Sequence, residues 1–540
     1  MTVAKSKSQK SQAQGKKAQE QRSVDEFVEN VEFLTKEIQQ LYCSDSIPWV
    51  IGYSGGKDST ATLQLIWNAI AQLSPQERQK TIHIITTDTL VENPYVSAWV
   101  RSSLKQIQKA AEEKELPFQP HLLQPEVKDT FWVGLIGKGY PAPRGKFRWC
   151  TSRLKIHPSN RFIRDVIRTN GEAILVLGIR KAESAGRASR MKEWENYKVR
   201  DRLCPNMNLP NSLVYSPVED WRNDEVWLYL MQWENPWGYS NKDLFSMYRG
   251  ATADNECPLV VDTSTPSCGS SRFGCWVCTL VSQDKSLSAM IHNDQEKEWL
   301  QPLLDFRKEL DVEESRNRRD FRRRNGDVQL YERNLDSEIS VVEPIPGPYL
   351  KEAREDWLRK LLETEKKLRD TAPEEMRDIT ILTIEELSEI RRIWLEERHE
   401  FDDSLPRIYK EVTGEEFIDP RPGADSSLLG SDEWAVLEEI CDGDGMHLEL
   451  MAKLLDTERQ YRKKTRRVGI YDALQKCFET SSRTAAEAII NAHKKRDLKE
   501  AVTKGDIDKV KQLTLGDAVE QDNENKVPNW ASMKFQKKES

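Results

Sequence analysis

The chain has 540 residues, of which 31% are charged and 38% hydrophobic, and its net charge is −8. The length allows several domains with ample buried core, and the negative charge means that any contact with nucleic acid must come from local basic patches. No stretch approaches the about 20 apolar residues of a membrane span and the first residues lack the apolar core of a signal peptide, so we expect a cytoplasmic protein.

Strands and helices alternate along the first half of the chain. A disordered tail is expected first, because residues 1–22 are rich in Lys, Gln and Ser, and an amphipathic helix follows from Ser23 to Tyr42. The predicted strands are 48–53, 81–87, 118–123 and 173–179, and the predicted helices are 58–73, 94–115 and 160–168. This order predicts an α/β fold with a doubly wound, mostly parallel sheet, whose ligands bind at the carboxyl ends of the strands.

The second half has helical patterns, including a Thr383-x-x-Glu386 capping box. The segments IPGPY (345–349) and DPRPGADSS (419–427) are interpreted as linkers. The expected divisions are a basic tail (1–22), a nucleotide domain (23–240), a four-cysteine segment (241–290), a helical C-terminal region (291–515) and a polar tail (516–540).

The sequence SGGKDS, Ser54 to Ser59, stands between the first of these strands and a helix. Glycines at such a point let backbone N–H groups turn toward one ligand, and a helix N-terminus adds partial positive charge, which together favour phosphate binding. Lys57 supplies charge for phosphate oxygens, and the hydroxyls of Ser54 and Ser59 can donate. Asp58 could cap the helix or help to hold Mg²⁺. The alternative interpretation of the whole hexapeptide is a glycine turn that merely begins a helix and binds no phosphate.

This hexapeptide resembles the PP-loop of the ATP pyrophosphatase superfamily, which cleaves ATP between the α and β phosphates. The resemblance implies ATP with Mg²⁺ as cofactor and a loop that holds the departing pyrophosphate.

Two further stretches carry candidate binding residues. Asp88 and Glu92 follow the second strand, where they could meet a ribose or a metal, although a solvated loop is the alternative. Five cations surround Cys150 and suggest a substrate that bears phosphate or sulfate. They are Arg144, Lys146, Arg148, Arg153 and Lys155.

The stretch LGIRKAESAGRASR (177–190) follows the fourth strand with Arg180, Glu183, Ser184, Arg187 and Arg190. Together with these stretches and SPVEDWRNDEVWLYL (216–230), it resembles the phosphoadenosine phosphosulfate (PAPS) reductase branch, over roughly residues 45–235. That likeness implies a sulfur-related reaction on a phosphorylated or adenylated substrate.

Four of the nine cysteines crowd into 22 residues, as Cys257-x10-Cys268-x6-Cys275-x2-Cys278. Four thiolates suit zinc or an iron–sulfur cluster, and a single Cys-x2-Cys pair favours [4Fe–4S] over structural zinc. Buried cysteines without a metal are the remaining alternative. The other cysteines are interpreted as structural, although Cys150 is also a hypothetical persulfide carrier.

These features, with RRDFRRRNG, GPY and DWLRKLL further on, resemble the DndC family of bacterial DNA phosphorothioation over most of residues 25–480. The family replaces a non-bridging phosphate oxygen of DNA with sulfur. The resemblance implies double-stranded DNA as substrate, a cysteine desulfurase as sulfur donor, and DndD- and DndE-type partners. The predicted catalytic residues are Lys57, Asp58, Ser59, Arg148 and Arg180, and the predicted cofactor-binding residues are Ser54, Gly55, Gly56, Lys57, Asp58, Ser59 and Asp88.

DNA contact is expected at two basic stretches, RNRRDFRRRNG (316–326) and RQYRKKTRR (459–467), although each could be a solvated helix face. Two enzymatic alternatives to phosphorothioation are a sulfonucleotide reductase and a nucleoside thiolase. A non-catalytic scaffold that binds nucleotide and a cluster is a third.

Overall fold

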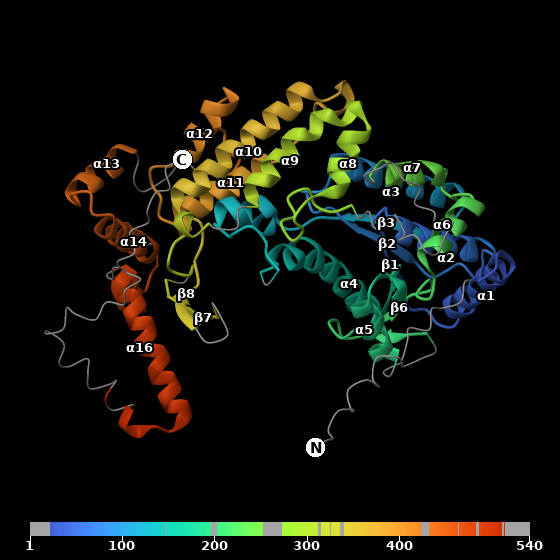
Figure 1. The fold of residues 1–540 in the computed structure, drawn as a ribbon, viewed down its shortest axis with the longest axis horizontal. Helices are drawn as coiled ribbons and strands as arrows, with labels where there is room; N and C mark the ends of the chain where they lie inside the picture. The colour runs from blue at the N-terminus through green and yellow to red at the C-terminus, as the bar shows by residue number, and fades with distance from the viewer. Residues whose placement is uncertain are drawn as a thin grey trace, which may run out of the picture. The chain divides into compact units, whose positions relative to one another are not determined.

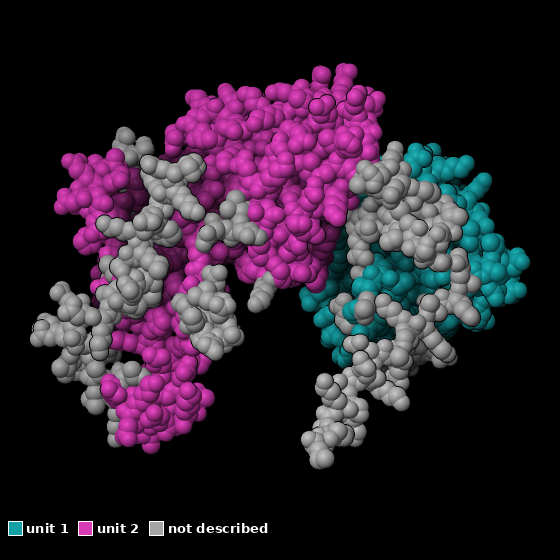
Figure 2. Space-filling model, viewed as in Figure 1, with its two compact units in different colours: residues 1–87, 94–123, 158–273 teal, residues 88–93, 124–157, 274–540 magenta. Residues whose placement is uncertain are grey.

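The computed structural model divides the chain into two compact units (Figure 2), which comprise residues 1–87, 94–123 and 158–273, and residues 88–93, 124–157 and 274–540. The structure describes residues 22–145, 147–195, 202–251, 273–311, 315–324, 326–334, 340–422, 431–462, 464–481, 485–509 and 512. Both predicted tails lie outside these residues, apart from Arg22. In the described part of the chain, no helix is both long and apolar enough to cross a membrane.

The first unit contains a six-stranded sheet in the order β3-β2-β1-β4-β6-β5 (Figure 1). All neighbouring strands are parallel except β5 and β6, which are antiparallel. The strands are β1 (Trp49–Gly52), β2 (Ile82–Thr87), β3 (Phe118–Leu123), β4 (Ala173–Leu177), β5 (Cys204–Pro205) and β6 (Ser212–Tyr215). The strand order reverses between β1 and β4, so the crevice in which sheets of this kind bind ligands lies past the carboxyl ends of these two strands. The predicted fold class is confirmed.

Helices cover both faces of this sheet. Trp49 and Ile51 of β1 join the larger core, which includes side chains of five helices, whereas Val50 packs on the opposite face against Ile163 and Val166 of α4 (His157–Asn170). This alternation is the two-residue period of a strand buried on both sides. The five helices are α1 (Val24–Cys43), α2 (Lys57–Ala71), α3 (Pro94–Glu113), α6 (Asn223–Gln232) and α7 (Asn241–Gly250), and the unit also contains α5 (Ala185–Glu195).

Local sequence signals define α1. The Ser23 Oγ accepts from the N–H of Glu26 (3.2 Å) and the Glu26 carboxylate accepts from the N–H of Ser23 (2.6 Å). This capping box satisfies two N–H groups that a helix start leaves without partners. The predicted helix from Ser23 to Tyr42 therefore begins where it was expected.

The second unit is mostly helical, as predicted, but it also has a hairpin of β7 (Leu330–Asn334) and β8 (Ser340–Pro344). The indole N–H of Trp132 donates to the Ile381 carbonyl (2.9 Å) and that of Trp394 to the Ile136 carbonyl (3.0 Å), which joins residues 124–157 to the C-terminal helices. Its α-helices are α8 (Lys285–Asn293), α9 (Gln301–Leu310), α10 (Lys351–Thr371), α11 (Ile384–Arg392), α12 (Ser404–Thr413), α13 (Ser431–Ile440), α14 (Gly445–Arg462), α15 (Ile470–Ser481) and α16 (Ala485–Lys504). Its π-helical turns are η2 (Val133–Gly137), η3 (Thr151–Ile156) and η8 (Ile393–Glu397).

The interpretation of IPGPY as a linker is wrong. Tyr349 is buried, the Gly347 N–H donates to the Asp320 carbonyl (2.6 Å), and the Asp320 N–H donates to the Pro348 carbonyl (2.8 Å). A Cβ on Gly347 would lie 1.7 Å from the carbonyl O of Arg322. The glycine and prolines therefore serve a close packing of two backbone segments rather than a flexible connection.

Candidate functional site

The SGGKDS loop turns sharply between β1 and α2 in the first unit. Gly55 has φ +70°, and a Cβ there would lie 2.5 Å from Cγ2 of Val100. Gly56 occupies the N-cap position of α2. Because glycine has no side chain, it offers no capping oxygen to the first N–H groups of the helix. This is the backbone arrangement that binds anions at helix N-termini.

The two serines hold the loop in shape. The Ser59 Oγ donates to the Gly56 carbonyl (2.9 Å) and accepts from the Ser54 N–H (3.2 Å), while the two hydroxyl oxygens are 3.1 Å apart. Because these bonds close the loop on itself, the hydroxyls predicted to bind phosphate also pre-organise the turn.

Lys57 lies at the start of α2 and is 5% exposed. Its Nζ lies 5.1 Å from the ring centroid of Tyr248 and 3.7 Å from the Asp58 carboxylate, and its backbone N–H donates to the Tyr248 hydroxyl (3.3 Å). Tyr248, on α7, is a residue of the site that sequence reasoning missed. A charge held so deep acts in a less polar medium than water and is correspondingly stronger.

Asp58 is paired with Arg180, which is 3% exposed. The Arg180 Nε donates to the Asp58 carboxylate (2.7 Å) and its Nη1 to the Trp221 carbonyl (3.2 Å). A Cβ on Gly178 would lie 2.7 Å from the carbonyl O of Asp58, so the backbone after β4 passes close to the start of α2. The ion pair with Arg180 was part of neither role predicted for Asp58. It links the loop after β1 to the loop after β4, and these two loops flank the crevice.

The close approach at Gly55 can be measured against a matched position. Gly171 also has positive φ (+86°), but nothing lies within 4 Å of a Cβ placed there. Gly171→Ala should lower the free energy of unfolding by about 1–2 kcal/mol, the cost of the left-handed conformation. Gly55→Ala should lower it by about 1–3 kcal/mol more, because the methyl group also overpacks against Val100.

Urea unfolding followed by tryptophan fluorescence would measure both variants. Equal losses at the two positions would contradict a tightly packed loop.

The second unit contains the Cys275-x2-Cys278 pair. A short antiparallel bridge joins Glu92 to Cys275, where the Trp276 N–H donates to the Val91 carbonyl (3.1 Å). The Thr89 hydroxyl lies 3.5 Å from the Cys275 sulfur, and the Cys278 N–H donates to the Cys275 carbonyl (3.0 Å). The segment after β2 thus fixes the turn that carries both thiols.

Cys150, the residue before η3, is in the same unit. Burial raises the pKa of its thiol, and negative charge on Cys278 raises it further. Burial also raises the pKa of Cys275 to about 11, although the positive charge of Lys155 acts to lower it. The Lys155 Nζ lies 3.7 Å from the Glu92 carboxylate. The pKa of Glu92 is raised by burial as well. A raised pKa leaves less of the reactive thiolate, so the carrier role of Cys150 gains no support from this setting and stays a hypothesis.

The described residues contain half of the predicted metal site. Cys275 and Cys278 lie on one turn, as two thiolates of a shared metal or cluster must, whereas Cys257 and Cys268 lie outside the described residues. Within the part of the chain that the structure describes, no three His, Cys, Asp or Glu side chains gather closely enough to hold a metal ion. The thiols present fit a cluster or a zinc ion as a half-site, and the four-ligand site stays a prediction.

Asp88 and Arg148 also belong to the second unit. The Asp88 carboxylate accepts from the Leu90 N–H (2.9 Å) and supports positive φ (64°) at Leu90, so it shapes the turn after β2. Arg148 is exposed, and its Nε donates to the Gly145 carbonyl (3.2 Å). Among the other cations predicted around Cys150, Arg144 pairs with Asp311, while Lys146 lies outside the described residues.

The six arginines of the stretch 316–326 have partners within the protein. These partners are Glu343 for Arg316, Asp356 for Arg318, the Gly347 carbonyl for Arg319, Asp320 and Glu449 for Arg322, Gln329 for Arg323, and Glu397 for Arg324. In the stretch 459–467, Arg459 pairs with Asp456 and Arg467 with Glu458. DNA contact at these stretches stays a prediction, and much of their charge is compensated within the protein.

Residues 48–280 match the family model described as "Phosphoadenosine phosphosulfate reductase domain". This range contains the SGGKDS loop, Arg180 and all four clustered cysteines.

One curated relative, "Uncharacterized protein MJ0066" of Methanocaldococcus jannaschii, is 26% identical over 200 residues. The match covers 37% of this chain and 35% of the archaeal protein, so the chain spans about a third of its relative.

Two solved structures are similar at low overlap. One is the FMN adenylyltransferase of Candida glabrata (13% identity, TM-score 0.26, covering 46% of this chain and 72% of that one). The other is the U34-tRNA thiolase NcsA of Methanococcus maripaludis with its [4Fe–4S] cluster (14% identity, TM-score 0.27, covering 51% and 81%). The sheet order and the family match together identify residues 48–280 as a PAPS reductase-like domain with the PP-loop fold.

Proposed function

We propose that the chain is an ATP-dependent sulfurtransferase of bacterial DNA phosphorothioation. The observation that carries the proposal is the SGGKDS loop, whose glycines, helix start and buried Lys57 flank the crevice where β1 and β4 diverge. The thiols of Cys150, Cys275 and Cys278 in the second unit support a role in sulfur chemistry.

The first step of the proposed reaction is adenylation. A non-bridging oxygen of a DNA phosphate attacks the α-phosphorus of ATP, a P–O bond forms, and pyrophosphate leaves with the electrons of the broken α–β linkage. The loop N–H groups and Lys57 stabilise the charge that grows on pyrophosphate, and Mg²⁺ shares this charge. The phosphate oxygen, otherwise a poor leaving group, is now part of AMP.

In the second step, sulfur at the level of sulfide attacks the DNA phosphorus and AMP departs, with no net change in oxidation state. If a cysteine persulfide attacks instead, its outer sulfur bonds to phosphorus and a mixed disulfide results. Two electrons from a thiol reductant then release the phosphorothioate and the cysteine. A cysteine desulfurase is the proposed source of the persulfide, Cys150 is a candidate carrier, and DndD- and DndE-type proteins are proposed partners.

A [4Fe–4S] cluster is the proposed occupant of the four-cysteine segment. When bound, it would supply sulfur, electrons or structural support. Cys275 and Cys278 would hold it from one turn, which the segment after β2 fixes through Thr89 and Val91.

The proposal is tested by measuring pyrophosphate release from ATP with and without DNA, in the presence of a desulfurase, cysteine and a thiol reductant. We expect release to depend on DNA, and nuclease digests of the product DNA to contain phosphorothioate dinucleotides by mass spectrometry. Release of sulfite from PAPS, with no phosphorothioate, would instead support a sulfonucleotide reductase, the alternative that the name of the matched domain favours.

A further inference from the structure

A tight turn in the second unit presents an exposed aromatic ring. Arg144 and Phe147 exchange two backbone hydrogen bonds (3.2 and 2.8 Å), which closes the turn. Phe147 is 44% exposed, and its ring lies edge-to-face to Tyr140, with centroids 6.5 Å apart. The turn therefore leaves part of the Phe147 ring open to solvent beside Tyr140.

The aromatic residues behind Phe147 are firmly packed. Trp149 lies 5.3 Å from Tyr140 and stacks on Phe131 at 5.3 Å, and its indole N–H donates to the Pro141 carbonyl (2.9 Å). A Cβ on Gly134 would lie 2.5 Å from the Trp149 ring, so the indole rests directly on the η2 backbone. The base of this aromatic stack is therefore rigid, while its outer ring is open.

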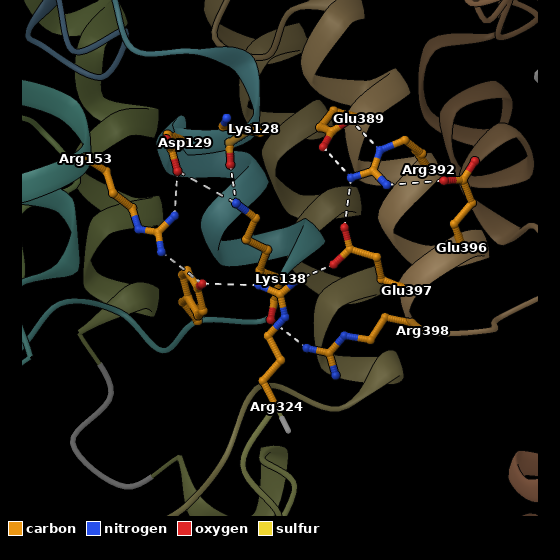
Figure 3. A network of polar contacts seen from close by, with 11 residues as sticks. Lys128, Asp129, Lys138, Arg153, Arg324, Glu389, Arg392, Glu396, Glu397 and Arg398 are labelled. Atoms are coloured by element: carbon orange, nitrogen blue, oxygen red, sulfur yellow. Dashed lines mark hydrogen bonds and ion pairs between the residues drawn. The ribbon is translucent and has the colours of Figure 1, made fainter. Parts of the chain in front are cut away.

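Arg153 and Arg324 both approach Tyr140, and Figure 3 shows the network of cations and carboxylates to which they belong. The Arg153 guanidinium lies 5.1 Å from the Tyr140 ring centroid and donates to its hydroxyl (3.2 Å), and Arg324 donates to that hydroxyl from the other side (3.4 Å). Arg398 donates to the carbonyl O of Lys138 (2.6 Å). Arg148 follows Phe147 directly and is exposed.

This cluster contains both cations and carboxylates. Asp129 contacts Arg153 (2.6 Å) and Lys138 (3.9 Å), and Glu397 contacts Arg324. Glu397 also pairs with Arg392 (2.8 Å), which is paired in addition with Glu389 and Glu396. Among these residues, six cations (Lys138, Arg148, Arg153, Arg324, Arg392 and Arg398) meet four carboxylates (Asp129, Glu389, Glu396 and Glu397), and the charges of Glu400 and Asp320 also act on Arg398. Burial lowers the pKa of Lys138, and the positive charge of Arg153 and Arg324 contributes to that shift.

We propose that this surface, the Tyr140 surface (Tyr140, Phe147, Arg148, Arg153 and Arg324), binds a DNA strand, with Phe147 stacking on a base and Arg148 contacting a phosphate. Open aromatic rings beside cations are the combination by which proteins hold single strands, because every base has a π-face and every linkage a charge. The choice of DNA over other polynucleotides rests on the proposed function.

Binding of a fluorescein-labelled 20-nucleotide single strand to the full chain, followed by anisotropy without ATP, tests the surface. Phe147→Ala should weaken binding about ten-fold through the lost stacking, and Phe147→Trp should retain it. Arg148→Ala should weaken binding and also reduce the dependence of log K on log[salt] by about 0.7, because one phosphate contact is lost. Phe33→Ala on α1 and Arg168→Ala on α4 change exposed residues of the same types elsewhere and should have no effect.

Unchanged binding by both Phe147→Ala and Arg148→Ala would overturn the inference, as would failure of the wild-type chain to bind the strand. Tighter binding of RNA of the same sequence would overturn the assignment to DNA. These outcomes are separate from the proposed function, because the assay needs no turnover. Wild-type phosphorothioate levels in cells that carry Phe147→Ala would reject the surface but not the activity.

Discussion

Replacement of Lys57 by alanine should reduce pyrophosphate release from ATP by about 10²–10³-fold, the usual loss when one group that stabilises developing charge is removed. The Lys57 ammonium is nearly buried at the start of α2, where the charge of a departing pyrophosphate would otherwise be poorly solvated. The release rate, measured under the conditions that give DNA-dependent turnover, checks this expectation.

The fold should tolerate the Lys57→Ala change. Asp58 keeps its bond from Arg180 (2.7 Å), and the serine bonds that close the loop do not involve the lysine side chain. The melting temperature should therefore stay within a few degrees of wild type. Lys242→Ala, which removes an exposed lysine from α7 in the same unit, is the matched control and should retain full activity. A Lys57→Ala protein that releases pyrophosphate at the wild-type rate would remove the catalytic role of the loop and favour a nucleotide-binding scaffold.

The sequence predicts best what is decided locally. The strands from β1 to β4 appear as apolar runs between helical patterns. The capping box, which spans the four residues from Ser23 to Glu26, marks the start of α1. The SGGKDS loop is equally local, since its glycines, serines and helix start are contiguous. By contrast, β5 and β6 are short and lie among polar residues, so their pairing depends on the sheet that they join.

Contacts between distant residues could not be predicted from one sequence. Tyr248 meets Lys57 across 191 positions, and Arg180 meets Asp58 across 122. The bridge between Glu92 and Cys275 likewise joins two segments that lie far apart in the sequence. Such pairs can be identified only in the folded chain, because the sequence around one partner contains no pattern that predicts the other.

Basic stretches show the same limit in terms of charge. Counting residues predicts a strongly positive segment at 316–326, but carboxylates as distant as Glu397 and Glu449 compensate it. The three cations of the Tyr140 surface, Arg148, Arg153 and Arg324, lie in two basic stretches that are evident in the sequence, and folding brings Arg153 and Arg324 together at the Tyr140 hydroxyl. Charge counted along the chain must therefore be corrected for the carboxylates that folding brings to it before it indicates a nucleic-acid contact.

Replacement of Cys275 by serine should remove most of the iron from anaerobically purified protein. Wild type should be brown, with absorbance near 400 nm and about four irons per chain, whereas the variant should retain less than about one, because a serine oxygen is a poor replacement for a thiolate on iron. Iron and acid-labile sulfide assays give the counts. Cys43→Ser, an exposed cysteine of the first unit, is the matched control and should keep full iron content.

The same assay, with phosphorothioate formation measured beside it, distinguishes a sulfur carrier from a cluster ligand at Cys150. If Cys150 carries sulfur, Cys150→Ser keeps the iron and loses phosphorothioate formation, since the four predicted ligands remain. If the Cys150→Ser variant loses its iron as the Cys275→Ser variant does, Cys150 is a cluster ligand. One of Cys257 and Cys268 is then not a ligand. A colourless wild-type protein with one zinc ion would reject the cluster, because four thiolates suit zinc equally well and zinc supplies neither electrons nor sulfide. Sulfur would then have to arrive as a persulfide, and the thiol reductant would become obligatory for turnover.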